Sequence, residues 1–503
     1  MTRGERTLRR LGGAAALAAL ALWYRPVLGA FFLEGDDYKI LTAARNPGAS
    51  SWRYWLFMFT HPAVNAPQYR PLSYFAIPYA ARAVFGADPR AFHAAALALF
   101  LVTVVLCRRW LSAALEDERA ALLGTFCYAL YGGHWALLPS LANLGKYYLP
   151  LAALLLGLLW SARKEPLTLG RAAALGALTA AAVAAQEGAF VFPLVFFLQA
   201  RADGRGRERA WLAAFLPSAA YLLLRLTVWG VPHAGFMDVS WTLLPFGLVH
   251  FAGVLVKQTF SPRWPPDVTM RFSWAGASAL AAWTAAAAWE RARRRENRSA
   301  FSLLAALAIL APFSVLRRHL FLGREIWAAP MAALLVGVWS RRLLSGLRGR
   351  ALPAVALAAA AGLAAKAPGQ RRAAESVYRF AAAGEREYLD EVSSLPPDGV
   401  VGLGGAAGRG PGGALGDVRK LWLRDRVEPG LLALRQPRRT YVIALERGGV
   451  LVRGGTFFYS QGGRWYDSMG HPQDVRVPEA TSFAKLRLPG WFGWPKTGAP
   501  DSD

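Results

Sequence analysis

The stretch LGGAAALAALALWYRPVLGAFFLEGDDY, residues 11–38, places an acidic pair, Asp36 and Asp37, directly after a run of apolar residues. A membrane-spanning helix needs about 20 mostly apolar residues, and this run is long enough. Four arginines precede it between residues 3 and 10, which resembles the start of a signal peptide, but an uncleaved first span is the preferred interpretation. Two carboxyl groups at the end of a span are either a solvated helix end or a catalytic acid pair.

The composition places the whole chain in the membrane class. Of its 503 residues 54% are hydrophobic and only 18% are charged, which is unlike a soluble globular protein. The net charge of +26 comes from basic residues spread through short loops, so we interpret them as topology signals and lipid contacts, with no nucleic acid as partner. Both cysteines, Cys107 and Cys127, lie in apolar segments and provide no disulfide framework or zinc site.

Hydropathy predicts an all-α polytopic membrane protein of about eleven transmembrane helices. The predicted spans are residues 11–32, 91–111, 120–140, 148–162, 169–185, 189–200, 210–229, 272–289, 301–316, 320–339 and 351–365. With this count, every cluster of basic residues falls on the cytoplasmic side, as the positive-inside rule requires; the clusters lie at 3–10, 108–109, 163–171, 201–209, 291–298 and 341–350. The N-terminus is then cytoplasmic and the C-terminal segment is outside.

Two long outer segments follow from this topology. Residues 33–90 carry the acidic pair and an aromatic-rich stretch that suits helices lying in the membrane interface. Residues 230–271 contain an apolar stretch, 241–260, that is long enough to span. If it spanned, the basic loop 291–298 would lie outside, so we predict an interfacial or re-entrant helix pair here.

The segment 367–503 has no apolar run and forms a separate predicted domain after the transmembrane domain, 1–366. It contains a helical stretch, a Gly-rich segment at 402–416, and alternating runs at 440–445 and 449–453 that read as strands. We predict a small α/β or mostly β extracytoplasmic domain. It shows no metal, nucleotide or nucleophile motif.

The order of several short motifs resembles the glycosyltransferase C (GT-C) superfamily, in particular its protein O-mannosyltransferase-like bacterial members. The resemblance extends to about Trp339 and says little about the sugar. The motifs are the acidic pair after the first span, YRPLS at 69–73, FGADP at 85–89, Phe92-His93 before the second span, and LRRHLF at 316–321.

The resemblance implies transfer of a hexosyl or pentosyl group, with inversion, from a polyprenyl-phosphate donor to a protein, glycan or lipid acceptor outside a bacterial inner membrane. An acidic residue in the first outer loop, Asp36 or Asp37, would take the proton of the acceptor hydroxyl. Cations stabilise the departing phosphate, and Arg binds phosphate bidentately. The candidates for this role are Arg317, Arg318 and Arg324, with Lys146 and His319 behind them.

Each further candidate has an ordinary structural alternative. Tyr69 and Arg70 either shape the site or anchor a loop, and His93 is more typical of a packing residue than of a ligand. Lys146 could extend its amine from a helix start to the membrane surface. Glu187 is either a functional intramembrane carboxyl group or a solvated outer turn.

Metal dependence and the class of activity also stay open in the sequence. Some family members use a divalent cation near the acidic pair, and beyond Asp36 and Asp37 only His61 could contribute a ligand here. The alternative functions are a lipid-linked glycan flippase, which would need charges along a path through the spans, and a non-catalytic membrane scaffold.

Overall fold

The structure of the protein is a computed structural model. It describes residues 3–30, 41–42, 51–61, 69–86, 88–163, 165–206, 208–229, 239–261, 274–294, 297–316, 324–346, 361–362, 364–376, 378–379, 400–405, 440–445, 448–453, 456–461, 464–467, 472–477 and 482–486. The chain forms two compact units. Unit 1 comprises residues 1–27, 93–138 and 143–375, and unit 2 comprises residues 28–92, 139–142 and 376–503.

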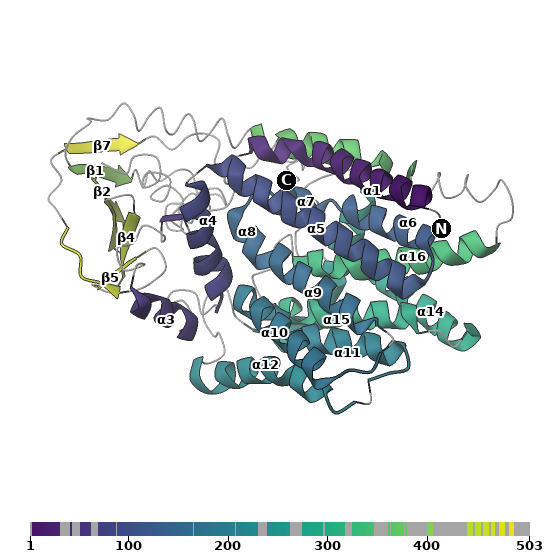
Figure 1. Cartoon of the computed structure of the whole chain (residues 1–503). Coiled ribbons are helices and arrows are strands. Elements are labelled where there is room, and N and C mark those ends of the chain that lie inside the picture. Colours follow the sequence, from purple (N-terminus) through teal and green to yellow (C-terminus); the bar gives the residue numbers. More distant parts are fainter. Residues whose placement is uncertain are drawn as a thin grey trace, which may run out of the picture. The chain divides into compact units, whose positions relative to one another are not determined.

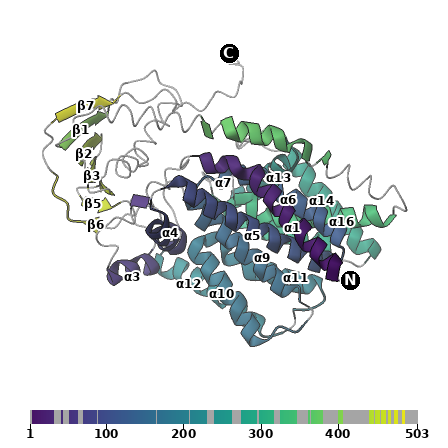
Figure 2. The same cartoon turned by 45° about the horizontal axis from the view of Figure 1, so that its top comes forward.

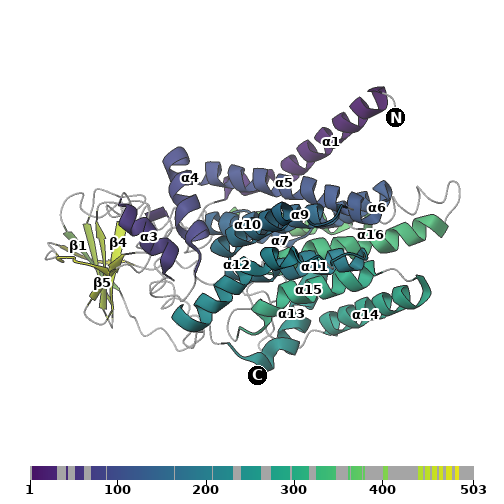
Figure 3. The ribbon, with the colours of Figure 1, turned by 60° about the horizontal axis from the view of Figure 1, so that its bottom comes forward.

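Unit 1 is helical, and many of its helices lie alongside one another (Figures 1 and 3). Helix α6 packs on α16, α10 packs on α12, and α13 packs on both α14 and α15. The short helix α8 (Leu141–Asn143) crosses the boundary between the two units along the chain. The other α-helices are α1 (Arg3–Tyr24), α5 (Pro89–Leu115), α6 (Glu118–Ala129), α7 (Gly133–Leu137), α9 (Leu149–Ser161), α10 (Leu169–Ala185), α11 (Phe192–Ala202), α12 (Trp211–Leu224), α13 (Leu244–Phe260), α14 (Trp274–Arg294), α15 (Arg298–Ser314) and α16 (Ala329–Gly346).

Short 3-10 and π-helical turns interrupt these helices. The 3-10 turns are η1 (Arg25–Gly29), η5 (Glu187–Val191), η8 (Trp241–Leu243) and η9 (Arg324–Ala328). The π turns are η4 (Leu144–Tyr148) and η6 (Arg225–Trp229) in this unit. Single π turns of this kind occur often at functional sites, because the extra residue redirects side chains.

Five helical segments of the described part are long and apolar enough to cross a membrane, and the chain is an integral membrane protein. They are Leu11–Gly29, Pro89–Leu115, Leu141–Ser161, Trp211–Trp229 and Trp241–Phe260. Helices 169–185 and 298–314 are apolar but shorter. Most of the predicted span 351–365 lies outside the described residues.

Residues 120–140 do not form the continuous span that hydropathy predicts. Helix α6 ends at Ala129, and α7 begins at Gly133. In the break the N–H of Gly132 donates to the carbonyl oxygen of Gln258 on α13, at 3.1 Å. The interruption is therefore held by a contact to a distant helix, which a hydropathy average does not register.

The stretch 241–260 also differs from its prediction. It forms one continuous helical segment, η8 followed by α13, instead of an interfacial or re-entrant pair. Contacts with α14 and α15 cover one side of it, and half of its apolar window is buried inside the structure. The predicted helix pair rested only on keeping the basic loop 291–298 on the cytoplasmic side. In the structure, packing against α14 and α15 accompanies a single continuous helix.

Close helix packing makes Gly124 on α6 a sensitive position. A Cβ atom there would lie 2.6 Å from the carbonyl oxygen of Ala333 on α16, and backbone cannot move aside as a flexible side chain can. We expect Gly124→Ala to lower the free energy of unfolding by about 1–3 kcal/mol. Thermal unfolding in detergent micelles measures it, with Gly12→Ala as control, since a Cβ at Gly12 meets nothing within 4 Å. Equal unfolding temperatures for the two variants would contradict the prediction.

Unit 2 joins a helical segment of the first outer loop to the C-terminal sheet. The helices are α3 (Trp52–Thr60) and α4 (Ile77–Phe85), with the π turn η3 (Leu72–Ala76) between them. The sheet has the order β6-β5-β4-β3-β2-β1-β7 (Figure 2). Its strands are β1 (Val400–Gly405), β2 (Thr440–Leu445), β3 (Gly448–Arg453), β4 (Thr456–Gln461), β5 (Arg464–Asp467), β6 (Pro472–Gln473) and β7 (Ser482–Leu486).

The alternating runs of the tail are strands, as the sequence predicts. Runs 440–445 and 449–453 are β2 and β3, which pair antiparallel with Tyr441 opposite Val452. The start of the Gly-rich segment is part of β1, which pairs parallel with both β2 and β7. Helix α3 contacts this sheet through Tyr54, whose hydroxyl donates to Oδ2 of the buried Asp467 on β5, at 3.3 Å.

Candidate functional site

Three short turns, η4, η5 and η9, pack against one aromatic cluster in unit 1. We define the aromatic cluster as Tyr147, Phe192, Phe313 and Trp327. The Trp327 ring lies 5.2 Å from Phe192, 5.5 Å from Phe313 and 6.5 Å from Tyr147, measured between centroids. These four side chains come from η4, α11, α15 and η9, so the cluster fixes these elements relative to one another.

The turn η9 brings Arg324 to this cluster. A 3-10 helix has three residues per turn, so Arg324 and Trp327 project from the same side of η9. The Arg324 guanidinium lies 5.3 Å from the centre of the Phe313 ring, a cation–π distance, and only 5% of the residue is exposed. A buried guanidinium is a strong, fixed hydrogen-bond donor in surroundings of low polarity, which suits this position to an anion.

The π turn η4 brings Lys146 to the same place. The Trp327 indole N–H donates to the backbone oxygen of Tyr147 at 3.0 Å, which ties η4 to η9 next to Lys146. Lys146 is 6% exposed. The structure therefore does not match the alternative in which this lysine extends its amine to the membrane surface.

The turn η5 completes the group with Glu187. The neighbouring Gly188 lies against the cluster, because a Cβ there would approach the edge of the Phe313 ring. Glu187 itself is half-buried, so it is neither a fully solvated turn residue nor a residue inside the apolar core. We define the polar end of unit 1 as Lys146, Glu187, Arg324 and Glu325.

Sequence reasoning missed two members of this region, Glu325 and Tyr131. Glu325 is completely buried, and the Tyr131 hydroxyl donates to its Oε1 at 3.0 Å. Tyr131 lies in the break between α6 and α7, which redirects it toward η9. The acidic residue directly after Arg324 was visible in the sequence, but a partner 194 positions away was not.

Arg225 is a further basic residue that sequence reasoning did not single out. It starts the π turn η6 and is 8% exposed. One turn earlier, the Tyr221 ring stacks on Phe190 of η5 at 6.1 Å. In the sequence, the only signal for Arg225 was that it is a lone arginine near the end of the predicted span 210–229.

The Tyr131–Glu325 hydrogen bond should be measurable as a coupling. We expect Tyr131→Phe to lower the free energy of unfolding by about 1–3 kcal/mol, because a buried carboxyl oxygen loses its donor. In a Glu325→Gln background the same change should cost less, and a double-mutant cycle of thermal unfolding measures the difference. Additive effects of the two substitutions would show that the bond contributes nothing.

Unit 2 contains its own buried cation, Arg70. Its Nη1 donates to the Tyr74 hydroxyl at 3.0 Å, the guanidinium lies 5.5 Å from the Tyr74 ring centre, and 8% of the residue is exposed. The Tyr69 hydroxyl donates to the backbone oxygen of Phe59 at 2.8 Å, and burial raises the pKa of Tyr69. Tyr69 thus anchors its loop to the end of α3, and Arg70 is held by Tyr74.

The remaining candidates divide into a packing residue and those outside the described part. His93 on α5 is completely buried, in line with a packing role. Asp36, Asp37, Arg317, Arg318 and His319 lie outside the described residues. Among the described residues, no group of three or more His, Cys, Asp or Glu side chains could hold a metal ion. His61 stacks on Phe57 at 4.6 Å and lies 2.8 Å from the Thr60 hydroxyl.

Chemically, the polar end of unit 1 contains two buried cations and two carboxyl groups on turns that adjoin one aromatic cluster, in surroundings of low polarity. Charges interact more strongly in such surroundings than in water, because screening by solvent is weak. Two buried cations therefore suit a doubly charged oxyanion group such as a phosphate. The rings of the aromatic cluster suit an apolar group or a sugar attached to that phosphate.

The bundle of interrupted apolar helices with this polar end is that of a polytopic membrane protein. No protein-family model matches the chain, and no curated protein matches it significantly. Two solved structures of ArnT from Cupriavidus metallidurans are similar to it. The one bound to undecaprenyl phosphate is 17% identical with a TM-score of 0.51, covering 86% of each chain. The apo structure is 16% identical with a TM-score of 0.48, covering 87% of this chain and 93% of that one.

The oligosaccharyltransferase from Archaeoglobus fulgidus is also similar. It is 12% identical with a TM-score of 0.44, covering 78% of this chain and 62% of that one. ArnT and this oligosaccharyltransferase both belong to the GT-C superfamily. The likeness to undecaprenyl-phosphate-bound ArnT establishes the fold, which agrees with the resemblance in the motifs.

Proposed function

We propose that this protein is a membrane glycosyltransferase that moves a sugar from a polyprenyl-phosphate donor to an acceptor on the outer side of the membrane. The observation that carries the proposal is that Arg324 lies against the Phe313 ring of the aromatic cluster, while the buried Lys146 lies on the turn that Trp327 ties to the same cluster. Its support from comparison is the shared fold with ArnT, which was crystallised with undecaprenyl phosphate. Whether a hexose or a pentose is transferred is not part of the proposal.

The residues divide the chemistry between them. Asp36 or Asp37 takes the proton from the acceptor hydroxyl as it attacks the anomeric carbon, with inversion at that carbon. The bond from the sugar to the phosphate oxygen breaks, and negative charge develops on the departing lipid phosphate. Arg324 and Lys146 stabilise that charge, and the GT-C resemblance gives the same role to Arg317, Arg318 and His319.

Within unit 2, Arg70 and Tyr69 have a site-shaping role in this proposal and do not touch the reacting atoms. Arg70 is fixed by Tyr74, and Tyr69 is fixed by Phe59, so both hold the segment that follows the acidic pair. Glu187 precedes Gly188, which lies against the Phe313 ring, and we assign it a site-shaping role.

A flippase is the second candidate, and the buried carboxyl groups disfavour it. A transporter would place ionisable groups along a path through the spans. In the part of the chain that the structure describes, the buried Glu290 lies near the end of α14, and Glu325 lies just before α16. Both are at helix ends, where an enzyme site forms more readily than a transport path.

Lipid-linked sugar accumulation in the host tests the function. The protein is deleted, polyprenyl-phosphate sugars are extracted, and the strain is complemented with wild type, Asp36→Asn, Asp37→Asn or Arg317→Ala. We expect one donor to accumulate on deletion and the wild type to clear it. If no donor changes, or if every variant complements equally, the transporter or scaffold reading replaces the enzyme.

A further inference from the structure

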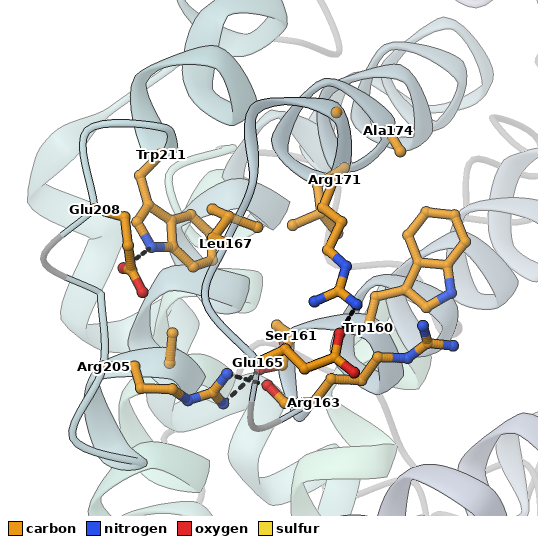
Figure 4. Close-up of a pocket in the computed structure, with 13 residues that line it drawn as sticks. Trp160, Ser161, Arg163, Glu165, Leu167, Arg171, Ala174, Arg205, Glu208 and Trp211 are labelled. Carbon is orange, nitrogen blue, oxygen red and sulfur yellow. Dashed lines mark hydrogen bonds and ion pairs between the residues drawn. The ribbon is translucent and has the colours of Figure 1, made fainter.

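A cavity of about 270 Å³ lies in unit 1 where α9, α10, α11 and α12 end or begin (Figure 4). Its walls include Trp160 and Arg163 on one side and Glu208 and Trp211 on the other, with Arg171 at the start of α10. This volume is just below the range of about 300–1,000 Å³ that is typical of small-molecule sites. The cavity is therefore of a size for a small polar group and not for a long chain.

The frame of this cavity is built by hydrogen bonds between two loops. The Arg205 guanidinium donates to the backbone oxygen of Ser161 at 2.7 Å, to that of Arg163, and to the Asp203 carboxylate at 3.0 Å. The turn that presents Arg205 needs glycine at Gly206, where φ is +90°. These bonds fix the loop after α9 to the loop after α11, so the walls are preorganised.

Charges of opposite sign face the cavity from its two sides. Arg171 forms an ion pair with Glu165. Among the described residues, the Arg163 guanidinium has no hydrogen-bond or ion-pair partner, and this side chain is exposed. On the other side, Glu208 accepts from the Trp211 indole at 3.3 Å and from the Gly206 N–H at 3.1 Å.

Glu208 stays ionised at neutral pH. Hydrogen bonds from its own backbone N–H, from the Trp211 indole and from Gly206 lower the pKa of its carboxyl group. These bonds favour the charged form of the acid. The cavity thus presents an unengaged cation and a stable anion on opposite walls.

The cavity lies at headgroup depth if the apolar helices cross the membrane. Segments Leu141–Ser161 and Trp211–Trp229 are both apolar enough to span, and they end and begin at the cavity. Trp160 and Trp211 occupy the positions where aromatic belts lie in membrane proteins. Leu169 and Leu212 flank it with 69% and 76% of their surfaces exposed, as expected of residues that face lipid tails.

We propose that this cavity binds the headgroup of a zwitterionic aminophospholipid, with the phosphate on Arg163 and the primary ammonium on Glu208 and the Trp211 ring. A phosphate alone would use the basic wall and leave Glu208 as a repelling charge. A zwitterion matches both walls, and its tails continue along the apolar surfaces of α10 and α12. The site is separate from the polar end of unit 1, so it does not depend on the proposed transfer reaction.

Native mass spectrometry of the purified, delipidated full chain tests the proposal. Dioleoyl phosphatidylethanolamine, phosphatidylcholine and phosphatidylglycerol are titrated in turn. We expect the ethanolamine lipid to bind most tightly, because a primary ammonium donates hydrogen bonds to a carboxylate and a trimethylated one does not. Arg163→Gln should weaken its binding about tenfold, and Arg163→Lys should restore part of the loss.

Two further variants make the result specific. Arg209→Gln removes the same charge from a neighbouring exposed residue outside the cavity wall, and it should leave binding unchanged. Glu208→Gln should remove the preference for ethanolamine over glycerol headgroups while phosphate-dependent binding persists. Inorganic phosphate and soluble glycerophosphoethanolamine serve as competitors, and only the latter should displace the lipid.

Three outcomes would overturn the proposal. These are tighter binding of phosphatidylglycerol by the wild type, equal losses for Arg163→Gln and Arg209→Gln, and an unchanged headgroup preference in Glu208→Gln. Size-exclusion profiles and unfolding temperatures show whether each variant is folded. Sugar transfer by the same variants is measured separately, and its loss or retention leaves the lipid result unaffected.

Discussion

Replacing the catalytic base of the acidic pair should reduce sugar transfer by about 10²–10⁴-fold, the usual contribution of a general base. We expect this loss for one of Asp36→Asn and Asp37→Asn, with Asp36 the first choice because the first acidic residue carries the role in GT-C relatives. Asparagine keeps the shape of the side chain but cannot take the proton of the acceptor hydroxyl. Transfer from the polyprenyl-phosphate donor identified in the host measures the effect.

The neighbouring acidic residue provides the matched control. Glu34→Gln removes a negative charge from the same segment two residues earlier, and it should leave the transfer rate within a few-fold of wild type. Full transfer by both asparagine variants with an identified donor would refute the assignment of the base. A comparable loss in Glu34→Gln would instead indicate that net charge in the loop, not proton transfer, matters.

Topology reasoning from sequence brought together the residues that the structure also brings together. Hydropathy and the distribution of arginines place Lys146 and Glu187 in outer turns, and Arg324 inside the predicted span 320–339, near its outer end. In the structure their turns η4, η5 and η9 meet at the aromatic cluster. Likewise the loops around Arg163 and Arg205, both predicted cytoplasmic, are joined by a hydrogen bond. Charge and hydropathy are read along the chain, and the end of a span at which a residue lies also follows from its position along the chain.

The details that shape the site were beyond those signals. The break at residues 130–132 follows from a contact to Gln258 and from the Tyr131–Glu325 bond, and both join residues more than a hundred positions apart. The continuous helix at 241–260 depends on packing against α14 and α15. A single sequence does not encode such pairs in any local pattern, so averaging over a window extends or divides helices wrongly.

The second large effect concerns Arg324. We expect Arg324→Ala to lower kcat/KM for transfer by about 10²–10³-fold, because a preorganised cation loses contact with the charge that develops on the departing phosphate. Arg324→Lys should recover only part of this, since an ammonium is a point charge and does not reproduce the planar fork of a guanidinium. Steady-state kinetics with the identified donor measures both variants.

The distribution of the loss between kcat and KM separates transition-state stabilisation from donor binding. A cation that acts on the leaving phosphate affects kcat and kcat/KM together, whereas a cation that only holds the donor raises KM. Arg341→Gln, near the far end of α16, removes the same charge away from the aromatic cluster and should leave both constants unchanged. Arg324 packs on the Phe313 ring and directly precedes the buried Glu325, so its alanine variant could also unfold η9. The Tyr131–Glu325 coupling, measured in the same variant, detects that. An intact coupling with full transfer activity would remove Arg324 from the mechanism and leave Lys146 as the described cation to test next.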